Sequence, residues 1–243
     1  MTQVKKSTGR RTRQVFPAEE TPDGSKEIIG ESAIRKFQVE RLVFFSDAIF
    51  AIAITLLVID LRLPDLDTTT LTDRLLWQHL AAHSSTFLGF AVSFYVIGTY
   101  WLIHHRMFYH VTDYNTSLLR NNLIFLLSIV LMPFSTTYIT SFSNGVVKLP
   151  LLLYTINISF TGCMIFRLWQ LISNPKHRLS GPLQRAMVTY NKVRALAIPV
   201  VFLLTFLLSF ISIAAAYKLL PLGLLTGSAV KWYFRRKHAF LQG

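Results

Sequence analysis

Arg41-Leu-Val-Phe-Phe-Ser-Asp47 runs without a break into Ala48-Ile-Phe-Ala-Ile-Ala-Ile-Thr-Leu-Leu-Val-Ile59. As a helix, this stretch is long and apolar enough to cross a lipid bilayer, which takes roughly 20 mainly apolar residues. It nevertheless carries a carboxylate, that of Asp47, about two turns in from its basic end. Because an ionisable group at that depth is costly to bury without a partner, Asp47 marks a functional or structural site.

The composition of the whole chain is also typical of a membrane-spanning protein. Of all 243 residues, 52% are hydrophobic and 15% are charged, which is the balance of a chain whose solvent is mostly lipid. We therefore expect an all-α integral membrane protein with six transmembrane helices, of which the last has the weakest hydropathy. The expected spans lie at 42–63, 83–104, 118–140, 148–169, 194–216 and 218–234.

The basic residues indicate the orientation of these spans. If both termini are cytoplasmic, 21 of the 25 Lys and Arg residues lie on the inner side, leaving only Arg62, Arg74, Lys148 and Lys218 outside. This bias is typical of a multi-pass protein of the cell membrane and supports the sixth span. Since the basic residues lie between apolar blocks, the net charge of +13 does not indicate a nucleic-acid partner. We expect a basic, disordered cytoplasmic tail at 1–35, a six-span transmembrane domain at 36–234 and a short basic cytoplasmic tail at 235–243.

One side of the first span carries an apolar stripe. At 100° per residue, Ile52, Thr55, Leu56 and Ile59 share this stripe, and Asp47 projects to nearly the opposite side of the helix. If the stripe lines a pathway, Asp47 points into the protein and braces the helix. Hydrophobic constrictions of this kind gate pores by dewetting. Spacing alone, however, favours ordinary helix packing or lipid contact over a channel.

Partners for the buried carboxylate are expected at the inner end of the second span. By topology, His104 lies on the same side of the membrane as Arg41 and Asp47. A hydrogen-bonded group of Arg41, Ser46, Asp47 and His104 would offset the cost of burial. The alternative is that His104 and His105 reach out to lipid headgroups.

Acidic residues follow the outer end of the first span. Asp60 and Asp65 would concentrate cations at a mouth if several copies of this end surrounded one. The alternative is a solvated loop whose acids balance Arg62 and Arg74.

No pattern of a catalytic, metal or cofactor site stands out. The single cysteine excludes a disulfide or a Cys-based metal site within one chain, and no phosphate-binding loop or nucleophile elbow occurs. Two hypotheses stay open beside a channel. One is a proton leak or proton-coupled transporter using Asp47 and His104, and the other is a membrane-embedded metalloenzyme using His104, His105 and Asp113.

Three motifs resemble those of a known family. Arg41-x-x-x-Phe45-Ser46-Asp47 and the apolar run after it resemble the first-helix signature of the lysosomal potassium channel family, also called the transmembrane protein 175 family, in its bacterial branch. Trp101-x-x-His104-x-Arg106-x-Phe108 and Leu131-Met-Pro133-Phe134-Ser135 are similar to its second- and third-helix motifs. The resemblance covers residues 40–140, and beyond them it rests on the number of spans.

The resemblance implies a function and an assembly. It implies a potassium-permeable channel, not an enzyme, in which the first helices of a homotetramer surround a central pore in the lipid bilayer. The constriction would fall on Ile52, Thr55 or Leu56, and Ile59, acting as gate and weak filter because the chain has no Thr-Val-Gly-Tyr-Gly carbonyl filter. The family's buried polar network would fall on Arg41, Ser46, Asp47 and His104. The long basic tail and the isoleucines of the constriction depart from the family pattern.

Overall fold

The computed structural model describes residues 25–59, 61, 72–142 and 147–237. These residues form helices that are connected by turns and loops. One isolated antiparallel bridge pairs Val111 with Ser180. The elements, in chain order, are α1 (Ser25–Ile59), α2 (Asp73–Ala82), α3 (Ser84–Phe108), α4 (Thr116–Val130), α5 (Met132–Ser141), α6 (Leu149–Ile172), the 3-10 turn η2 (Pro175–His177), α7 (Arg185–Leu208), α8 (Ile213–Leu219), the 3-10 turn η3 (Leu220–Leu225) and α9 (Thr226–Lys237).

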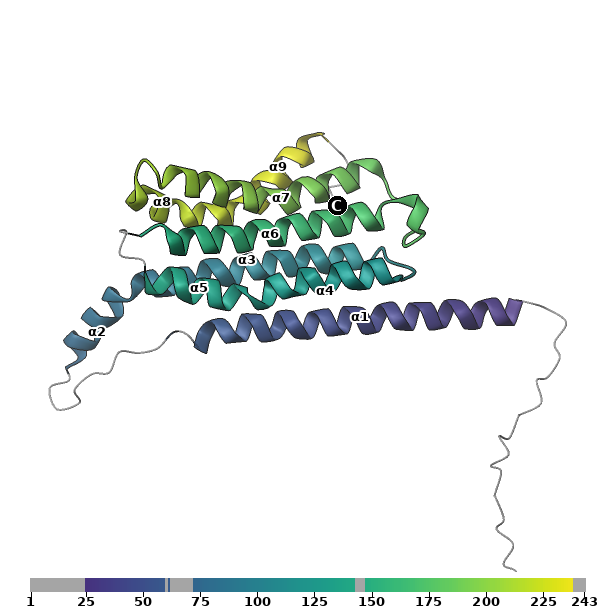
Figure 1. Cartoon of the computed structure of the whole chain (residues 1–243), viewed down its shortest axis with the longest axis horizontal. Coiled ribbons are helices and arrows are strands. Elements are labelled where there is room, and N and C mark those ends of the chain that lie inside the picture. The colour runs from purple at the N-terminus through teal and green to yellow at the C-terminus, as the bar shows by residue number, and fades with distance from the viewer. Residues whose placement is uncertain (1–24, 60, 62–71, 143–146, 238–243) are drawn as a thin grey trace, which may run out of the picture.

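The long helices lie side by side, with α1 at one edge of the bundle (Figure 1). On its inner side α1 packs against α3, α4 and α5, and these in turn pack against α6. The most extensive pair is α6 with α7, and α8, η3 and α9 cover α7. The short helix α2 buries none of its residues and lies outside the bundle. The centre is filled by large side chains such as Tyr100, Phe125 and Trp169, all inaccessible to solvent.

Five stretches are long and apolar enough to cross a membrane, and a bent pair of helices makes a sixth candidate. They are Ala33–Ile59, Ser84–Phe108, Thr116–Ser141, Leu149–Ile172, Arg185–Leu208 and the pair Ile213–Gly223 with Gly227–Phe234. The prediction of an all-helical membrane protein is therefore confirmed. The sixth span differs from a straight helix, because its halves meet at 55° through the turn η3.

The third expected span is divided in two at Leu131, between α4 and α5. Pro133 has no N–H to donate to the carbonyl four residues before it, so an uninterrupted α-helix loses a hydrogen bond there. The amide of Leu131 still donates to the oxygen of Leu127, and the amide of Ser135 to that of Leu131, at 3.1 Å each. The two helices thus continue as one candidate span.

Two helices begin earlier than hydropathy predicts. The fifth was expected at 194–216 but runs over Arg185–Leu208, because its first turns are polar yet hydrogen-bonded as helix. Likewise α1 begins at Ser25, inside the range 1–35 that was expected to be a tail. At the other end, α9 reaches Lys237 and so includes the start of the expected tail at 235–243.

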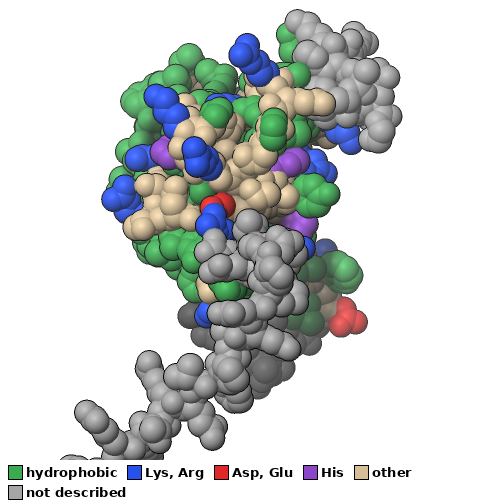
Figure 2. All heavy atoms as spheres, turned by 90° about the vertical axis from the view of Figure 1, so that its right-hand side faces the viewer, with side chains coloured by type: hydrophobic (Ala, Val, Ile, Leu, Met, Phe, Trp, Pro, Cys, Tyr) green, Lys and Arg blue, Asp and Glu red, His purple; other side chains and the backbone are tan. Residues whose placement is uncertain are grey.

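Basic side chains gather at one end of the bundle. Figure 2 shows Lys and Arg side chains over the end where α3 finishes and α7 begins, with imidazoles among them. The charge pattern predicts that this end is the cytoplasmic one.

Candidate functional site

The helix α1 presents two different faces. The residues that face the bundle are almost completely buried, and they recur every three or four positions, as one face of a helix requires. They are Val39, Leu42, Ser46, Phe50, Ala53 and Leu57. The opposite face is apolar as well, yet it has no packing partner within the described part of the subunit.

All four residues of the expected constriction lie on this outward face. Ile52 is 58% exposed, Leu56 40% and Ile59 62%, and Thr55 is exposed beside them. Thr55 Oγ1 donates to the carbonyl oxygen of Ile52 at 2.9 Å, so its proton is used within the helix while its oxygen can still accept or coordinate. An exposed apolar face on a spanning helix must be covered by lipid or by another protein chain.

A chain of buried hydrogen bonds holds α1 to the bundle. Ser46 Oγ donates to the carbonyl oxygen of Leu42 at 2.8 Å, which leaves its lone pairs to accept from Asn122 Nδ2 at 2.9 Å. The Asn122 amide is thereby oriented, and its Oδ1 accepts from His104 Nε2 at 2.9 Å. Three helices, α1, α3 and α4, are joined in this way.

The imidazole of His104 lies in an aromatic pocket. Its ring centroid is 4.3 Å from that of Phe108, 5.4 Å from that of Phe125 and 5.8 Å from that of Phe50. Because Nε2 carries the donated proton, Nδ1 of the neutral ring is an acceptor, and this buried atom has no partner among the described residues.

Asp47 is held by a second contact between α1 and α3. Its Oδ1 accepts a hydrogen bond from Trp101 Nε1 at 2.9 Å, and the indole in turn stacks on the ring of His105, with centroids 5.5 Å apart. The carboxylate is half-buried and lies on the side of α1 away from Ile52 and Ile59. The hydrogen bond of Asp47 therefore holds α1 against α3.

The structure thus brings together part of the expected polar network. Ser46 and His104 are joined through Asn122, and Asp47 bonds to Trp101, whereas Arg41 is exposed and makes no hydrogen bond or ion pair within the described ranges. Asn122 and Trp101 are the members that the sequence prediction missed. The sequence offered a signal for each. Asn122 is a polar amide within an apolar span, and Trp101 is an indole one helical turn before His104.

Two other expectations concern acidic and metal-binding residues. Asp60 and Asp65 lie outside the described residues. Over the part of the chain that is described, no three His, Cys, Asp or Glu side chains form a group that could hold a metal ion. Of the residues in the metalloenzyme hypothesis, His104 is bonded to Asn122 and Asp113 to Arg35, so they belong to separate contacts.

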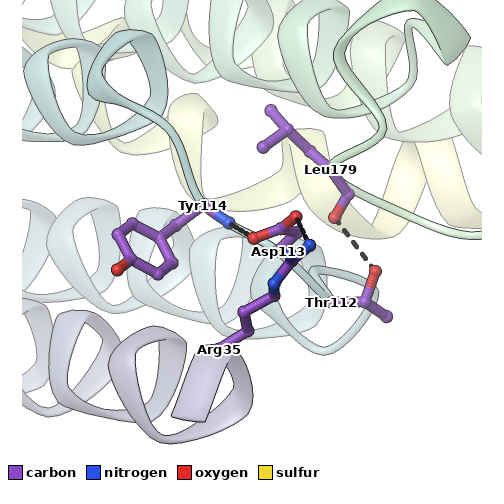
Figure 3. A network of polar contacts seen from close by, with 5 residues as sticks. All are labelled: Arg35, Thr112, Asp113, Tyr114 and Leu179. Carbon is purple, nitrogen blue, oxygen red and sulfur yellow. Dashed lines mark hydrogen bonds and ion pairs between the residues drawn. The ribbon is translucent and has the colours of Figure 1, made fainter. Parts of the chain in front are cut away.

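Asp113, in the loop after α3, contacts Arg35 of α1 (Figure 3). Arg35 Nη1 of α1 pairs with Asp113 Oδ2 at 2.9 Å, and the other carboxylate oxygen accepts from the Tyr114 amide at 2.8 Å. The amide of Thr112 donates to the carbonyl oxygen of Leu179 at 2.9 Å, which ties the loop after α3 to the loop before α7. The inner end of α1 is therefore connected to both loops.

The chain is similar to known membrane proteins. A family model described as "Endosomal/lysosomal potassium channel TMEM175" matches residues 41–133, from the first motif on α1 into α5. A potassium channel from Streptomyces collinus is 35% identical over 102 residues, which are 42% of this chain and 48% of that protein. An endosomal/lysosomal proton channel TMEM175 from Danio rerio is 36% identical over 77 residues, which are 30% of this chain and 15% of that protein. The matched stretch thus spans about half the length of the bacterial relative.

A solved structure has the same fold. The crystal structure of a lysosomal potassium-selective channel TMEM175 homolog from Chamaesiphon minutus superposes with a TM-score of 0.66 at 24% identity, covering 79% of this chain and 98% of that one. Fold and composition together define an all-helical, multi-pass membrane protein. The matched region contains the motifs on α1 and α3 and the start of the third motif, so the similarity of this chain to the TMEM175 family lies in residues 41–133. The description of this family model names an ion channel.

Proposed function

We propose that the chain is a potassium-permeable cation channel in which four copies surround a central pore lined by α1. The observation that carries this proposal is the outward apolar face of α1, which holds Ile52, Thr55 and Ile59 in a membrane-spanning helix at the edge of the subunit. Around a fourfold axis, these faces would meet one another instead of lipid. The names of the bacterial relatives support potassium as the permeating ion.

The same face would act as gate and weak filter. Rings of Ile52 and Ile59 exclude water when narrow, because isoleucine side chains offer nothing to replace the hydration shell of an ion. When the rings widen, potassium passes nearly hydrated, with Thr55 oxygens as its available ligands. Selectivity over sodium then rests on the lower dehydration cost of the larger ion.

The polar contacts behind α1 fit a bracing role in this channel. The side chains behind α1 do not face the proposed pore: Ser46, Asn122 and His104 are buried, and Asp47 bonds to Trp101. Their hydrogen bonds fix the rotation of α1 about its own axis. The basic end of the bundle would be cytoplasmic, with both termini on that side.

Ion flux into liposomes tests the gate. Replacing Ile52 or Ile59 by Asn puts a hydrogen-bonding side chain into the constriction, so potassium flux should rise several-fold. Val58→Asn is the matched control: Val58 is 54% exposed on the same helix but points about 120° away from Ile52. Its flux should stay near that of the unmodified channel. If all three substitutions raise the flux equally, or if neither Ile52→Asn nor Ile59→Asn raises it, the gate does not lie on this face.

The same liposomes distinguish the proton alternative. Proton and sodium flux are measured beside potassium flux. A pH gradient that dissipates without potassium movement, and is preserved by Asp47→Asn, would establish a proton pathway through Asp47 in place of the proposed channel.

A further inference from the structure

A cavity of about 420 Å³ opens at the basic end of the bundle. It lies between the last turn of α3, with the loop after it, and the first turns of α7. Its wall includes His105, Arg106, Tyr109, His110, Tyr190 and Asn191. None of these residues belongs to the outward face of α1 or to the hydrogen bonds behind it, so the cavity is separate from the proposed pore.

The charge in this cavity is not neutralised by the protein. Arg106 is exposed and makes no hydrogen bond or ion pair within the described ranges, and no Asp or Glu belongs to the wall. The carboxylate of Asp113, in the loop after α3, is committed to Arg35 and to the amide of Tyr114. The cavity therefore offers an unpaired guanidinium.

Aromatic contacts fix the walls of the cavity. The ring of His105 stacks on Trp101, with centroids 5.5 Å apart, and the ring of His110 lies against Tyr109 at 5.4 Å. On α7, Asn191 Nδ2 donates to the carbonyl oxygen of Met187 at 3.0 Å. Two imidazoles thus border the guanidinium in fixed positions, and ring nitrogens and hydroxyls provide further donors.

The depth of the cavity matches that of lipid headgroups. Trp101, an amphipathic side chain of the kind found at membrane interfaces, lies in the last two turns of α3, and the spanning helix α7 begins at Arg185 on the same end. A groove between spanning helices on the cytoplasmic side that carries basic groups suits an anionic headgroup. Arginine binds phosphate through two parallel N–H donors, which fits this chemistry better than a lone ammonium does.

We propose that this cavity binds the phosphate-bearing headgroup of an anionic lipid of the inner leaflet, with Arg106 as its main phosphate ligand. The largely aromatic wall of Tyr109 and Tyr190 then covers the glycerol portion, and the acyl chains run along the lipid-facing surface between α3 and α7. Such a lipid would set the packing of α7 against α3. This proposal does not depend on which ion the chain conducts.

Native mass spectrometry of the detergent-solubilised full chain tests the site. The probes are phosphatidylglycerol, phosphatidylcholine and inorganic phosphate. Arg106→Gln should lower the affinity for phosphatidylglycerol about tenfold and remove about one bound lipid per subunit, an effect expected when a charge-assisted phosphate contact is lost. The control is Arg120→Gln, which removes the same charge from an exposed position on α4 outside the cavity. It should retain the lipid.

Three outcomes would overturn the proposal. The first is equal lipid retention in Arg106→Gln and Arg120→Gln, which means that Arg106 is not a specific ligand of the lipid. The second is equal binding of phosphatidylcholine and phosphatidylglycerol. The third is displacement of the lipid by inorganic phosphate at equal concentration, which indicates a site for a free anion. If Arg106→Gln does not fold, Arg106→Lys decides: it keeps the charge but loses the paired donors, so it should bind more weakly than the unmodified chain, unlike Arg120→Lys.

Discussion

Asn122 is the single side chain that connects Ser46 on α1 to His104 on α3. In Asn122→Ala, the buried Nε2–H of His104 loses its acceptor and Ser46 loses a donor. A buried polar group left without its partner costs about 1–3 kcal/mol. We expect a clearly lower unfolding midpoint, measured by thermal denaturation in detergent.

The neighbouring amide provides the matched control. Asn121 is also buried, but its Nδ2 donates to the carbonyl oxygen of Ser117 within the same helix, at 2.7 Å. Asn121→Ala therefore removes no hydrogen bond between the described helices, and its midpoint should fall less. If the two variants unfold at the same temperature, the hydrogen bonds through Asn122 do not hold α1.

These two amides also show how far sequence can predict the site. Hydropathy and topology placed Ser46, Asp47 and His104 at one end of the membrane. They could not choose between adjacent asparagines, because one position turns a side chain by 100° and the rotation of α4 depends on packing that the sequence does not display. In the same way, an indole can donate to any acceptor within reach, so the sequence could not assign the N–H of Trp101 to Asp47.

At the scale of the helices, the sequence predicted the spans better than their ends. The apolar runs located α3 and α6 to within a few residues, because lipid requires an uninterrupted apolar length. The start of α7 was missed because helical hydrogen bonds continue into polar residues such as Lys192, which hydropathy counts against a span. A proline such as Pro133 predicts an interruption of its helix. The 55° bend between the two halves of the last candidate span, in contrast, depends on how they pack on α7.

The contact between α6 and α7 depends on one glycine. A Cβ on Gly162 would collide with Cγ of Pro199 and lie 2.9 Å from the carbonyl oxygen of Ala195. Neither can move easily, since one belongs to a rigid ring and the other to the backbone of α7. We expect Gly162→Ala to destabilise the protein by about 1–3 kcal/mol, as overpacking does, despite the gain in helix propensity. Chemical denaturation in mixed micelles measures this.

Gly98 on α3 is the control for this substitution. A Cβ there meets nothing within 4 Å, so Gly98→Ala should leave the protein unchanged or stabilise it by up to about 1 kcal/mol. Opposite signs for the two glycines would establish that close approach of α6 to α7 sets the cost. A loss of similar size at both positions would instead implicate helix flexibility.

For the whole molecule, the decisive feature is that α1 packs on one side only. Its buried face ends at Leu57, and Ile59 on the other face is 62% exposed, although α1 is among the candidate spans. A single subunit in a membrane would present this face to lipid. A homotetramer with α1 at its centre would present it to three other copies, which makes assembly a property that the proposed function requires.

Cysteine cross-linking distinguishes these two surroundings. In a Cys163→Ser background, which removes the one native cysteine, we expect Ile59→Cys to form covalent dimers on oxidation, because disulfides need Cα atoms within about 7 Å. Leu204→Cys is the control, since Leu204 is 60% exposed on α7, and α7 lies across the bundle from α1 (Figure 1). Cross-links at both positions indicate random collision. A cysteine at 59 that reacts with a lipid-soluble maleimide but never cross-links places α1 against lipid, and the central pore is then wrong.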